Sequence, residues 1–221
     1  MKAELITNSG DDLMIVNAAR VSFDKESEWI TQHPTDFIEQ KILNWKDEKL
    51  IKYLATHNHY TPFAHPQITL RETVPIFVAR QRFKHVVGFT YNEISRRYVD
   101  EPPKLYKPEF FRKKAANKKQ GSLDEPVESG PWVGTYALAE LYALKAYKEM
   151  VEAGVCPEQA RMVLPQSMYT SYYVTGSLAA FARAYKLRSQ PDAQLEIQEL
   201  AEEWDRIIRP LYPVSWSALV D

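Results

Sequence analysis

The sequence predicts an α+β fold, in which a single-domain subunit spanning residues 1–221 combines a mixed sheet with flanking helices. Strand-like and helix-like segments follow one another without the regular alternation of a doubly wound sheet. The 221 residues, 45% of them apolar, suit one domain with a sizeable core. The 12% aromatic content and only seven glycines exclude disordered and collagen-like chains.

The first elements expected are a short strand and an amphipathic helix. Residues 2–6 predict the strand. Residues 11–21 predict the helix, because Leu13, Val16 and Ala19 recur at helical spacing and can pack on one side.

A helix, a strand and a further helix follow. Residues 48–57 predict a helix with apolar residues on one side. The short mixed pattern of residues 67–73, with β-branched threonines at two positions, indicates a strand. Pro75 suits the first turn of a helix that continues through residue 86.

The second half of the chain begins with a change in composition. Residues 108–134 are polar, rich in Lys, Ser and Gly, and have no apolar period, which predicts a long loop or insertion rather than a second domain. Apolar spacing over residues 141–151, stopped by Gly154, predicts a helix. Residues 167–175 are β-branched and aromatic and predict a strand, and the 4, 3, 4, 3 apolar steps of residues 193–207 predict the last long helix.

Composition also bounds the function. A net charge of −1 argues against bulk binding to nucleic acid or to an anionic membrane. No stretch approaches the roughly 20 apolar residues of a spanning helix, and the first residues lack a signal-peptide pattern, so we expect a cytoplasmic protein. The single Cys156 excludes an internal disulfide and any multi-cysteine metal site. The seven glycines allow neither a G-x-G-x-x-G motif nor a P-loop, so a bound nucleotide must be held by side chains and helix ends.

The densest candidate site is the basic segment 80–97. It contains five cations and one acid, which are Arg80, Arg82, Lys84, Arg96, Arg97 and Glu93. On a helix, Gln81, Lys84 and His85 share a face that suits a phosphate beside a hydrogen-bonding base. A charge run is more often a solvated helix. Interleaved apolar residues instead predict a mostly buried segment whose cations need anionic partners.

Other clusters offer weaker or complementary chemistry. His57, His59 and His65 could ligate a metal, but no carboxylate lies between positions 50 and 71, so hydrogen-bonding loop histidines are favoured over a metal site. Cys156 precedes Pro157 and could be a nucleophile, although a small buried residue is the commoner role. A second basic cluster again indicates an anionic ligand and comprises Arg161, Arg183, Lys186 and Arg188.

Five collinear segments resemble the flavin-dependent thymidylate synthase family. They are AARVSF (18–23), HNHYTPFAH (57–65), PIFVARQRFKHVVGFTYNEISRRY (75–98), EQARMVLPQSMYT (158–170) and LRSQPDAQLEI (187–197). Each motif alone is weak, whereas five in order are strong. No segment that resembles the family was found in residues 24–56, in residues 99–157 or in the C-terminal helix.

The chain departs from the family pattern at specific positions. Lys84-His85-Val86 stands where the family usually has Arg-His-Arg, and lysine keeps the charge without the planar fork. Ala64 replaces a usual glutamate, and Ser177 and Ala179 stand where Asn and Arg are frequent. The stretch NEISRRY is intact, which favours retained activity.

The resemblance implies the fold, the assembly and the reaction. It implies an α+β subunit in a homotetramer with shared active sites, and tightly bound FAD with NADPH as reductant. Methylene-tetrahydrofolate would be the carbon donor and dUMP the acceptor, which makes the protein a methyltransferase of nucleotide biosynthesis that forms dTMP. The absence of a Rossmann motif and the two arginine clusters agree with such an enzyme.

The resemblance also implies roles for individual residues. Arg188 would lie against the uracil edge and stabilise negative charge at N3, since arginine stays cationic and presents parallel donors. The residues expected around dUMP are Gln81, Arg82, Lys84, Glu93, Ile94, Ser95, Arg96, Arg97, Arg161 and Arg188. The residues expected near FAD are His59, Thr61, Lys84, His85, Val86, Glu93, Ser177 and Arg183, and His59 and His85 could also border the folate.

Three alternatives stay open at the level of sequence. A related enzyme could leave a hydroxymethyl group on dUMP, and the mass of the product would distinguish it. A metal-dependent hydrolase built on the histidines would be colourless and contain metal. A nucleic-acid-binding module built on residues 80–97 and on the Lys-rich loop within residues 108–134 would bind DNA with a steep salt dependence.

Overall fold

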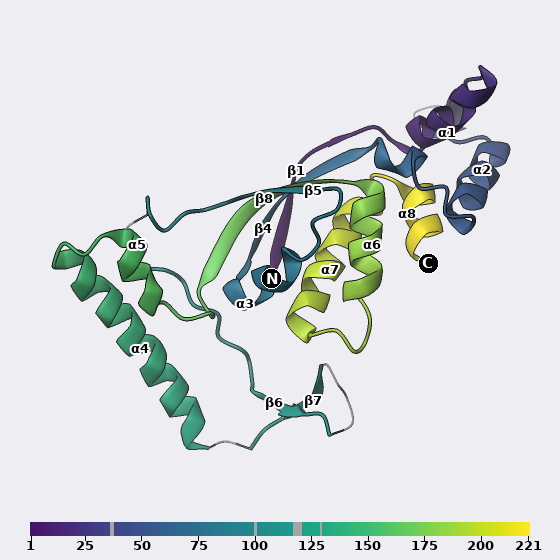
Figure 1. Ribbon diagram of the computed structural model, residues 1–221. Coiled ribbons are helices and arrows are strands. Elements are labelled where there is room, and N and C mark those ends of the chain that lie inside the picture. Colours follow the sequence, from purple (N-terminus) through teal and green to yellow (C-terminus); the bar gives the residue numbers. More distant parts are fainter. Residues whose placement is uncertain (36–37, 100, 117–120, 129) are drawn as a thin grey trace.

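The centre of the molecule is a four-stranded antiparallel sheet, seen in a computed structural model that describes residues 1–35, 38–99, 101–116, 121–128 and 130–221 (Figure 1). The strand order is β1 (Lys2–Ser9), β4 (Gln67–Pro75), β8 (Tyr169–Ser177) and β5 (Phe89–Glu93). Every neighbouring pair is antiparallel. This sheet with segregated helices confirms the predicted α+β class. The prediction of a mixed sheet is wrong, because all the strand pairs of this sheet are antiparallel.

The sheet buries one face against two helices. Along β4, Ile68, Leu70, Glu72 and Val74 are buried while the residues that alternate with them are more exposed, as the two-residue period of a strand requires. The helices α6 (Leu178–Arg188) and α7 (Leu195–Ile208) cover this face (Figure 1). The predicted apolar stripe of α7 is confirmed at Ile197, Leu200 and Trp204, which are fully buried. At its end the stripe is wrong by one residue, because Ile208 is fully buried and Ile207 only half-buried.

A second group of helices lies at one end of the sheet. It consists of α1 (Asp12–Arg20), α2 (Trp45–Thr56) and α8 (Pro213–Val220). The buried Asp12 carboxylate accepts hydrogen bonds from the backbone N–H groups of Val214 and Ser215, both at 2.9 Å, and so caps α8. Tyr212 donates its hydroxyl to the carbonyl of Ser9 at 2.9 Å. Segments about two hundred residues apart are therefore fixed together.

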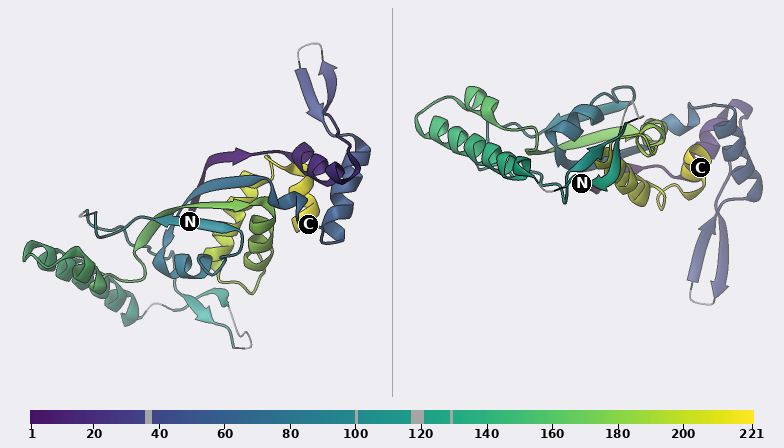
Figure 2. Two further views of the ribbon diagram at one scale, coloured as in Figure 1. Left: turned by 45° about the horizontal axis from the view of Figure 1, so that its top comes forward. Right: turned by 90° about the horizontal axis from the view of Figure 1, so that it is seen from below.

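Two arms extend from opposite ends of this body (Figure 2). One is the long helix α4 (Pro131–Glu152) with the short α5 (Pro157–Ala160), and the other is the hairpin of β2 (Ile30–Thr35) and β3 (Ile38–Ile42). Three-residue 3₁₀ turns connect elements, namely η1 (Val21–Phe23), η2 (Pro62–Ala64) and η3 (Arg161–Val163). Among the described residues, no helix is long and apolar enough to cross a membrane.

The main difference from the predicted elements lies at residues 75–86. The helix α3 (Ile76–Arg82) ends at Arg82, and residues 83–88 form a turn. Val86 and Val87 are 65% and 68% exposed, so the prediction of a long, mostly buried helix is wrong at its second half. Within residues 108–134 the structure places β6 (Arg112–Lys114), β7 (Ser122–Pro126) and the first turn of α4. These short polar strands pair with each other and lack the apolar alternation that would predict them.

Candidate functional site

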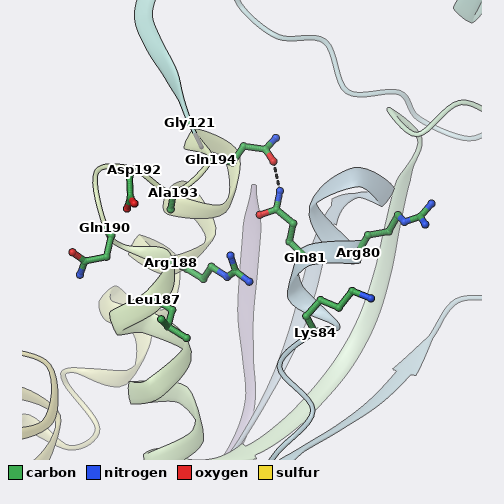
Figure 3. A pocket seen from close by; sticks show the side chains of 10 residues that line it. All are labelled: Arg80, Gln81, Lys84, Gly121, Leu187, Arg188, Gln190, Asp192, Ala193 and Gln194. Atoms are coloured by element: carbon green, nitrogen blue, oxygen red, sulfur yellow. Dashed lines mark hydrogen bonds between the residues drawn. The ribbon is translucent and has the colours of Figure 1, made fainter. Parts of the chain in front are cut away.

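A cavity of about 780 Å³ opens between α3 and the segment that follows α6 (Figure 3). Its basic side chains are Arg80, Lys84 and Arg188, against one acid, Asp192. Gln81, on α3, lines the same cavity. Among the described residues, none of the three cations has a carboxylate within 4.0 Å. The cavity therefore suits an anion or an electron-rich ring edge.

His85 holds Arg188 in this cavity. The Arg188 Nε–H donates to His85 Nε2 at 2.9 Å, which leaves the outer guanidinium nitrogens free of that contact. Because the acceptor nitrogen must be unprotonated, the imidazole is the neutral tautomer. Burial, followed by the nearby charges of Arg188, Arg82 and Arg183, lowers the pKa of His85 to about 4. The imidazole thus stays neutral at pH 7 and orients Arg188.

The turn after His85 packs on the first half of α6. Gly88 has a φ of +79°, and a Cβ at that position would lie 3.0 Å from the Ala180 Cβ, so glycine permits this close approach. Ser177 caps α6 by accepting from the Ala180 N–H at 3.2 Å. Arg183 donates to the carbonyl of Val87. The structure thereby brings together the predicted residues His85, Val86, Ser177 and Arg183.

A second cavity, of about 350 Å³, lies beside the first, and Arg80 lines both. It is also lined by Glu93, Ile94, Arg96 and Arg161, all four predicted to surround a nucleotide. Glu93 accepts a hydrogen bond from the Thr170 hydroxyl at 2.6 Å. Three arginines against one carboxylate make this second cavity suitable for a phosphate.

Two further predicted residues lie outside the lining of both cavities. Arg97 pairs with Glu158 at 3.6 Å and donates from its Nε to the Ser95 hydroxyl at 3.2 Å. Both side chains of the Arg97–Glu158 pair are about half exposed, so this pair constrains Arg97 only weakly.

The predicted contact of Arg82 with substrate is wrong. Arg82 is 0% exposed and pairs with the equally buried Glu72, with an Nε to Oε2 distance of 3.0 Å. Burial alone would lower the pKa of Arg82, but the attraction of Glu72 outweighs it and the pKa is raised. The Arg82 guanidinium also donates to the Tyr91 hydroxyl at 2.6 Å. Arg82 is therefore a core residue, and it supports the site only indirectly, through the buried residues that it contacts.

The histidine segment lies near the start of α6. Leu178 donates its N–H to the carbonyl of Pro66 at 3.1 Å, which joins the segment just after η2 to the start of α6. His59 and Thr61 are exposed there, and the rings of His57 and His59 lie 6.2 Å apart. The described residues contain no group of three or more His, Cys, Asp or Glu that could hold a metal ion.

Cys156 lies at the start of the four-residue α5 and is exposed. It lines neither of the two cavities. We expect Cys156→Ala to keep its steady-state rate within about twofold of the unchanged protein, because a surface thiol outside the site contributes little to stability or chemistry. A folded Cys156→Ala protein without activity, measured beside Cys156→Ser, would instead indicate a cysteine nucleophile.

Sequence reasoning missed Gln194 as a residue of the larger cavity and Glu196 as its hydrogen-bond partner. Gln194 lines the larger cavity, and Gln81 donates a hydrogen bond to it across 113 positions of sequence (Figure 3). Both residues fall within the 187–197 motif, which is the signal in the sequence that could have identified them. The sequence analysis did not single out Glu72, although the two-residue period of β4 places this position on the core face, between the buried Leu70 and Val74.

Comparisons with known proteins show the family of this chain. The family model described as "Thymidylate synthase complementing protein" matches residues 4–214. The flavin-dependent thymidylate synthase of Thermus thermophilus is 36% identical over 218 residues, covering 97% of this chain and 73% of that protein. The one from Thermosipho africanus is also 36% identical, covering 98% and 89%.

A solved structure is also similar to this chain. The UMP/dUMP methylase PolB from Streptomyces cacaoi, bound with 5-Br dUMP, aligns with a TM-score of 0.80 and 28% identity over 98% of this chain and 93% of that one. The resemblance found in the sequence is thus confirmed, and the chain belongs to the thymidylate synthase complementing protein family, which is that of the flavin-dependent thymidylate synthases.

Proposed function

We propose that this chain methylates dUMP to dTMP with FAD, with methylene-tetrahydrofolate as carbon donor and NADPH as reductant. The observation that carries the proposal is the larger cavity, in which Arg188 and Gln81 converge in a chain of this family. The relatives named above are flavin-dependent thymidylate synthases, and the solved neighbour is bound with a dUMP analogue.

Arg188 is the proposed catalytic residue. Its guanidinium is held by His85 at 2.9 Å, and it lines the cavity with no described carboxylate to neutralise it. Negative charge that develops on the pyrimidine during attack from C5 would be stabilised by these fixed donors. Because His85 orients Arg188 before the substrate binds, little reorganisation is needed when the charge appears.

The smaller cavity is the proposed phosphate site. Arg80, Arg96 and Arg161 supply fixed positive charge there, and Glu93 supplies an acceptor for a sugar hydroxyl. Ile94 lines the same cavity, and Ser95 and Arg97 follow it in sequence. We propose that these residues hold the 5′-phosphate and the ribose.

The residues proposed for FAD are His59, Thr61, Lys84, His85, Val86, Glu93, Ser177 and Arg183. The exposed Lys84 and Arg183 suit the pyrophosphate, and the exposed apolar Val86 suits the face of a ring. These side chains thus fit the group without any glycine-rich loop. When bound, FAD supplies the hydride that completes the methyl group, while the residues described here bind, orient and shield the pyrimidine.

We propose that the active form is a homotetramer with sites shared between subunits. The two cavities share Arg80, but each is lined by a different set of the residues predicted to bind dUMP. A complete dUMP site can therefore form between two chains if each chain contributes one of the two sets. Helix α4 also exposes several large apolar side chains, which suit contact with a second copy. They are Trp132, Val133, Leu138, Leu141 and Tyr142. Light scattering of the purified protein tests the tetramer.

Two measurements test the reaction. The visible spectrum of the purified protein should show bound oxidised flavin, and a colourless protein would contradict the proposal. Product mass after incubation with dUMP, methylene-tetrahydrofolate and NADPH should equal that of dTMP, whereas a hydroxymethyl product would identify the alternative enzyme. UMP should be assayed in parallel, because the solved neighbour is named a methylase of both UMP and dUMP.

Replacing Lys84 tests the phosphate contacts of the larger cavity. Lys84 is exposed and lines the cavity beside Gln81, so its ammonium can meet a phosphate as a point charge. Lys84→Ala should weaken the binding of dUMP or FAD by roughly 1.5–3 kcal/mol, the contribution of a charged hydrogen bond. Lys84→Arg should be tolerated, since arginine restores a bidentate donor.

Flavin retention and the KM for dUMP, measured on both variants, test whether Lys84 lies in the binding site. If Lys84→Ala keeps its flavin and its KM, the lysine lies outside the binding site and the assignment of residues 84–86 is wrong.

A further inference from the structure

A third cavity, of about 440 Å³, lies between α1 and α2, which pack against each other at one end of the sheet (Figure 1). The motif at residues 18–23 supplies one wall, with Ala19, Arg20 and Phe23, and α2 supplies most of the other. Neither cavity described above is lined by a residue of this motif. The motif is thus shared with the family, but no role has yet been given to its side chains.

The lining of this cavity is positively charged and includes no Asp or Glu. Its four cations are Arg20, Lys25, Lys46 and Lys49. Arg20 is already paired, because its Nε donates at 3.2 Å to the carboxylate of Asp47, which is 2% exposed. Among the described residues, none of the three lysines has a carboxylate within 4.0 Å. Arg20 is therefore a fixed part of the wall, whereas the lysines can pair with an anionic ligand.

Aromatic rings position the lysines and line the cavity. The Nζ atoms of Lys49 and Lys46 lie 4.7 and 5.7 Å from the centre of the Trp45 ring, at distances typical of cation–π contacts. These contacts keep both ammonium groups on the same side of α2. Phe23 and Tyr53 line the cavity and are 75% and 53% exposed. The cavity therefore offers exposed rings beside separate positive charges.

Tyr53 connects this cavity to the histidine segment. The centre of its ring lies 4.0 Å from that of His57 and 6.0 Å from that of His59, which it meets edge-on. His59 is one of the residues proposed to bind FAD and expected to border the folate. A ligand that lies beside His59 and extends past Tyr53 therefore reaches the lysines.

We propose that the cavity between α1 and α2 binds the glutamate tail of the folate co-substrate. This inference rests on the proposed function. Methylene-tetrahydrofolate carries a pterin at one end, a benzoyl ring in the middle and a glutamate at the other end, and each further glutamate that extends the tail adds one carboxylate. With the pterin near His59, the benzoyl ring can pack on Tyr53 and the carboxylates can pair with the lysines.

The kind and the spacing of the cations favour a row of carboxylates over a single phosphate. A compact phosphate is best held by the planar fork of an arginine, and the one arginine of this cavity is occupied by Asp47. Lysines act as separate point charges. Lys46 and Lys49 lie one helical turn apart on α2, and Lys25 belongs to the segment after η1, so the three can pair with successive carboxylates of a flexible tail.

The test compares the affinities of the flavin-loaded protein, measured by calorimetry, for 5-formyl-tetrahydrofolate with one and with five glutamates. The pentaglutamate should bind about tenfold more tightly, the equivalent of two exposed ion pairs. This advantage should shrink in about 0.5 M salt, because salt screens exposed charges. Lys49→Gln should reduce the advantage by about two- to fivefold, and Lys46→Gln/Lys49→Gln should nearly remove it. The affinity for the monoglutamate should change much less in both variants.

Lys52→Gln is the matched control, because Lys52 is an exposed lysine of the same helix that does not line the cavity. It should leave the ratio of the two affinities unchanged, and an equal loss in Lys52→Gln and Lys49→Gln would overturn the inference. A loss confined to NADP⁺ binding in Lys49→Gln would also overturn it, by placing the dinucleotide phosphate in this cavity. Unaltered protein that binds both folates equally contradicts only this inference, whereas protein that binds neither contradicts the proposed function.

Discussion

Arg188→Ala should lower kcat by roughly a hundred- to a thousandfold, while the Kd for dUMP rises much less. Removing one fixed donor from a site of developing negative charge costs about 3–4 kcal/mol in the transition state. The ground-state pyrimidine is neutral, and we propose that dUMP is held mainly through its phosphate, in the other cavity. Burial, and then the charge of Arg82, lower the pKa of Arg188, but an arginine remains cationic at neutral pH. The loss should therefore appear in turnover rather than in binding.

Single-turnover rates and dUMP affinity, measured on flavin-loaded protein, separate the two effects. Arg206→Ala is a matched control, because Arg206 is an exposed arginine of α7 that pairs only with Glu203 among the described residues. It should leave both quantities unchanged. A near-normal kcat for Arg188→Ala would remove this residue from the mechanism.

Arg82→Met should lower the free energy of unfolding by about 3–5 kcal/mol, which is the usual cost of leaving one partner of a buried ion pair alone. For a chain of this size the melting temperature should fall by roughly 6–20 °C. Glu72 would remain 0% exposed without its cation. The loss of the Arg82 bond to Tyr91 would add to the effect, because Tyr91 also donates to the carbonyl of His85 at 2.7 Å.

The double variant Arg82→Met/Glu72→Leu tests this explanation. Replacing both partners with apolar residues removes the stranded charge and should recover part of the lost stability. Recovery should stay incomplete, because Tyr172 and Trp204 also donate to Glu72, at 2.6 and 2.8 Å, and would lose their acceptor. Thermal and urea unfolding of the single and double variants give the coupling energy. A double variant less stable than Arg82→Met would refute the explanation.

The sequence predicted those parts of the molecule that depend on local periodicity. The apolar steps of α7 and the threonines of β4 identify these elements, and five motifs identify the family. The end of α3 at Arg82 could not be predicted, since charged and apolar residues continue through His85 without a glycine or proline before Gly88. The hairpins were missed because their strands are short and polar.

Several residues that the motifs singled out line the two cavities, whereas Arg82 was misassigned because burial decides its role. Arg82 follows Gln81 in a basic segment and resembles a ligand-binding arginine until the fold places Glu72 beside it. That pairing joins β4 and α3 and depends on the turn of the chain between them. The link between Gln81 and Glu196 likewise exists only after α7 packs against α3.

The order of the strands has a consequence for the newly made chain. Strand β4 pairs with β8, and Gln67 lies opposite Ser177. The pairing of β4 with β8 therefore cannot be completed until Ser177 has been synthesised, which takes roughly 5–20 s at ordinary rates of synthesis. During that time an apolar strand edge is open to other unfinished chains. The charges of Arg71 and Glu72 in the middle of β4 then oppose stacking into aggregates, as charged gatekeepers do. The carboxylate later enclosed in the core thus also protects β4 before the core exists.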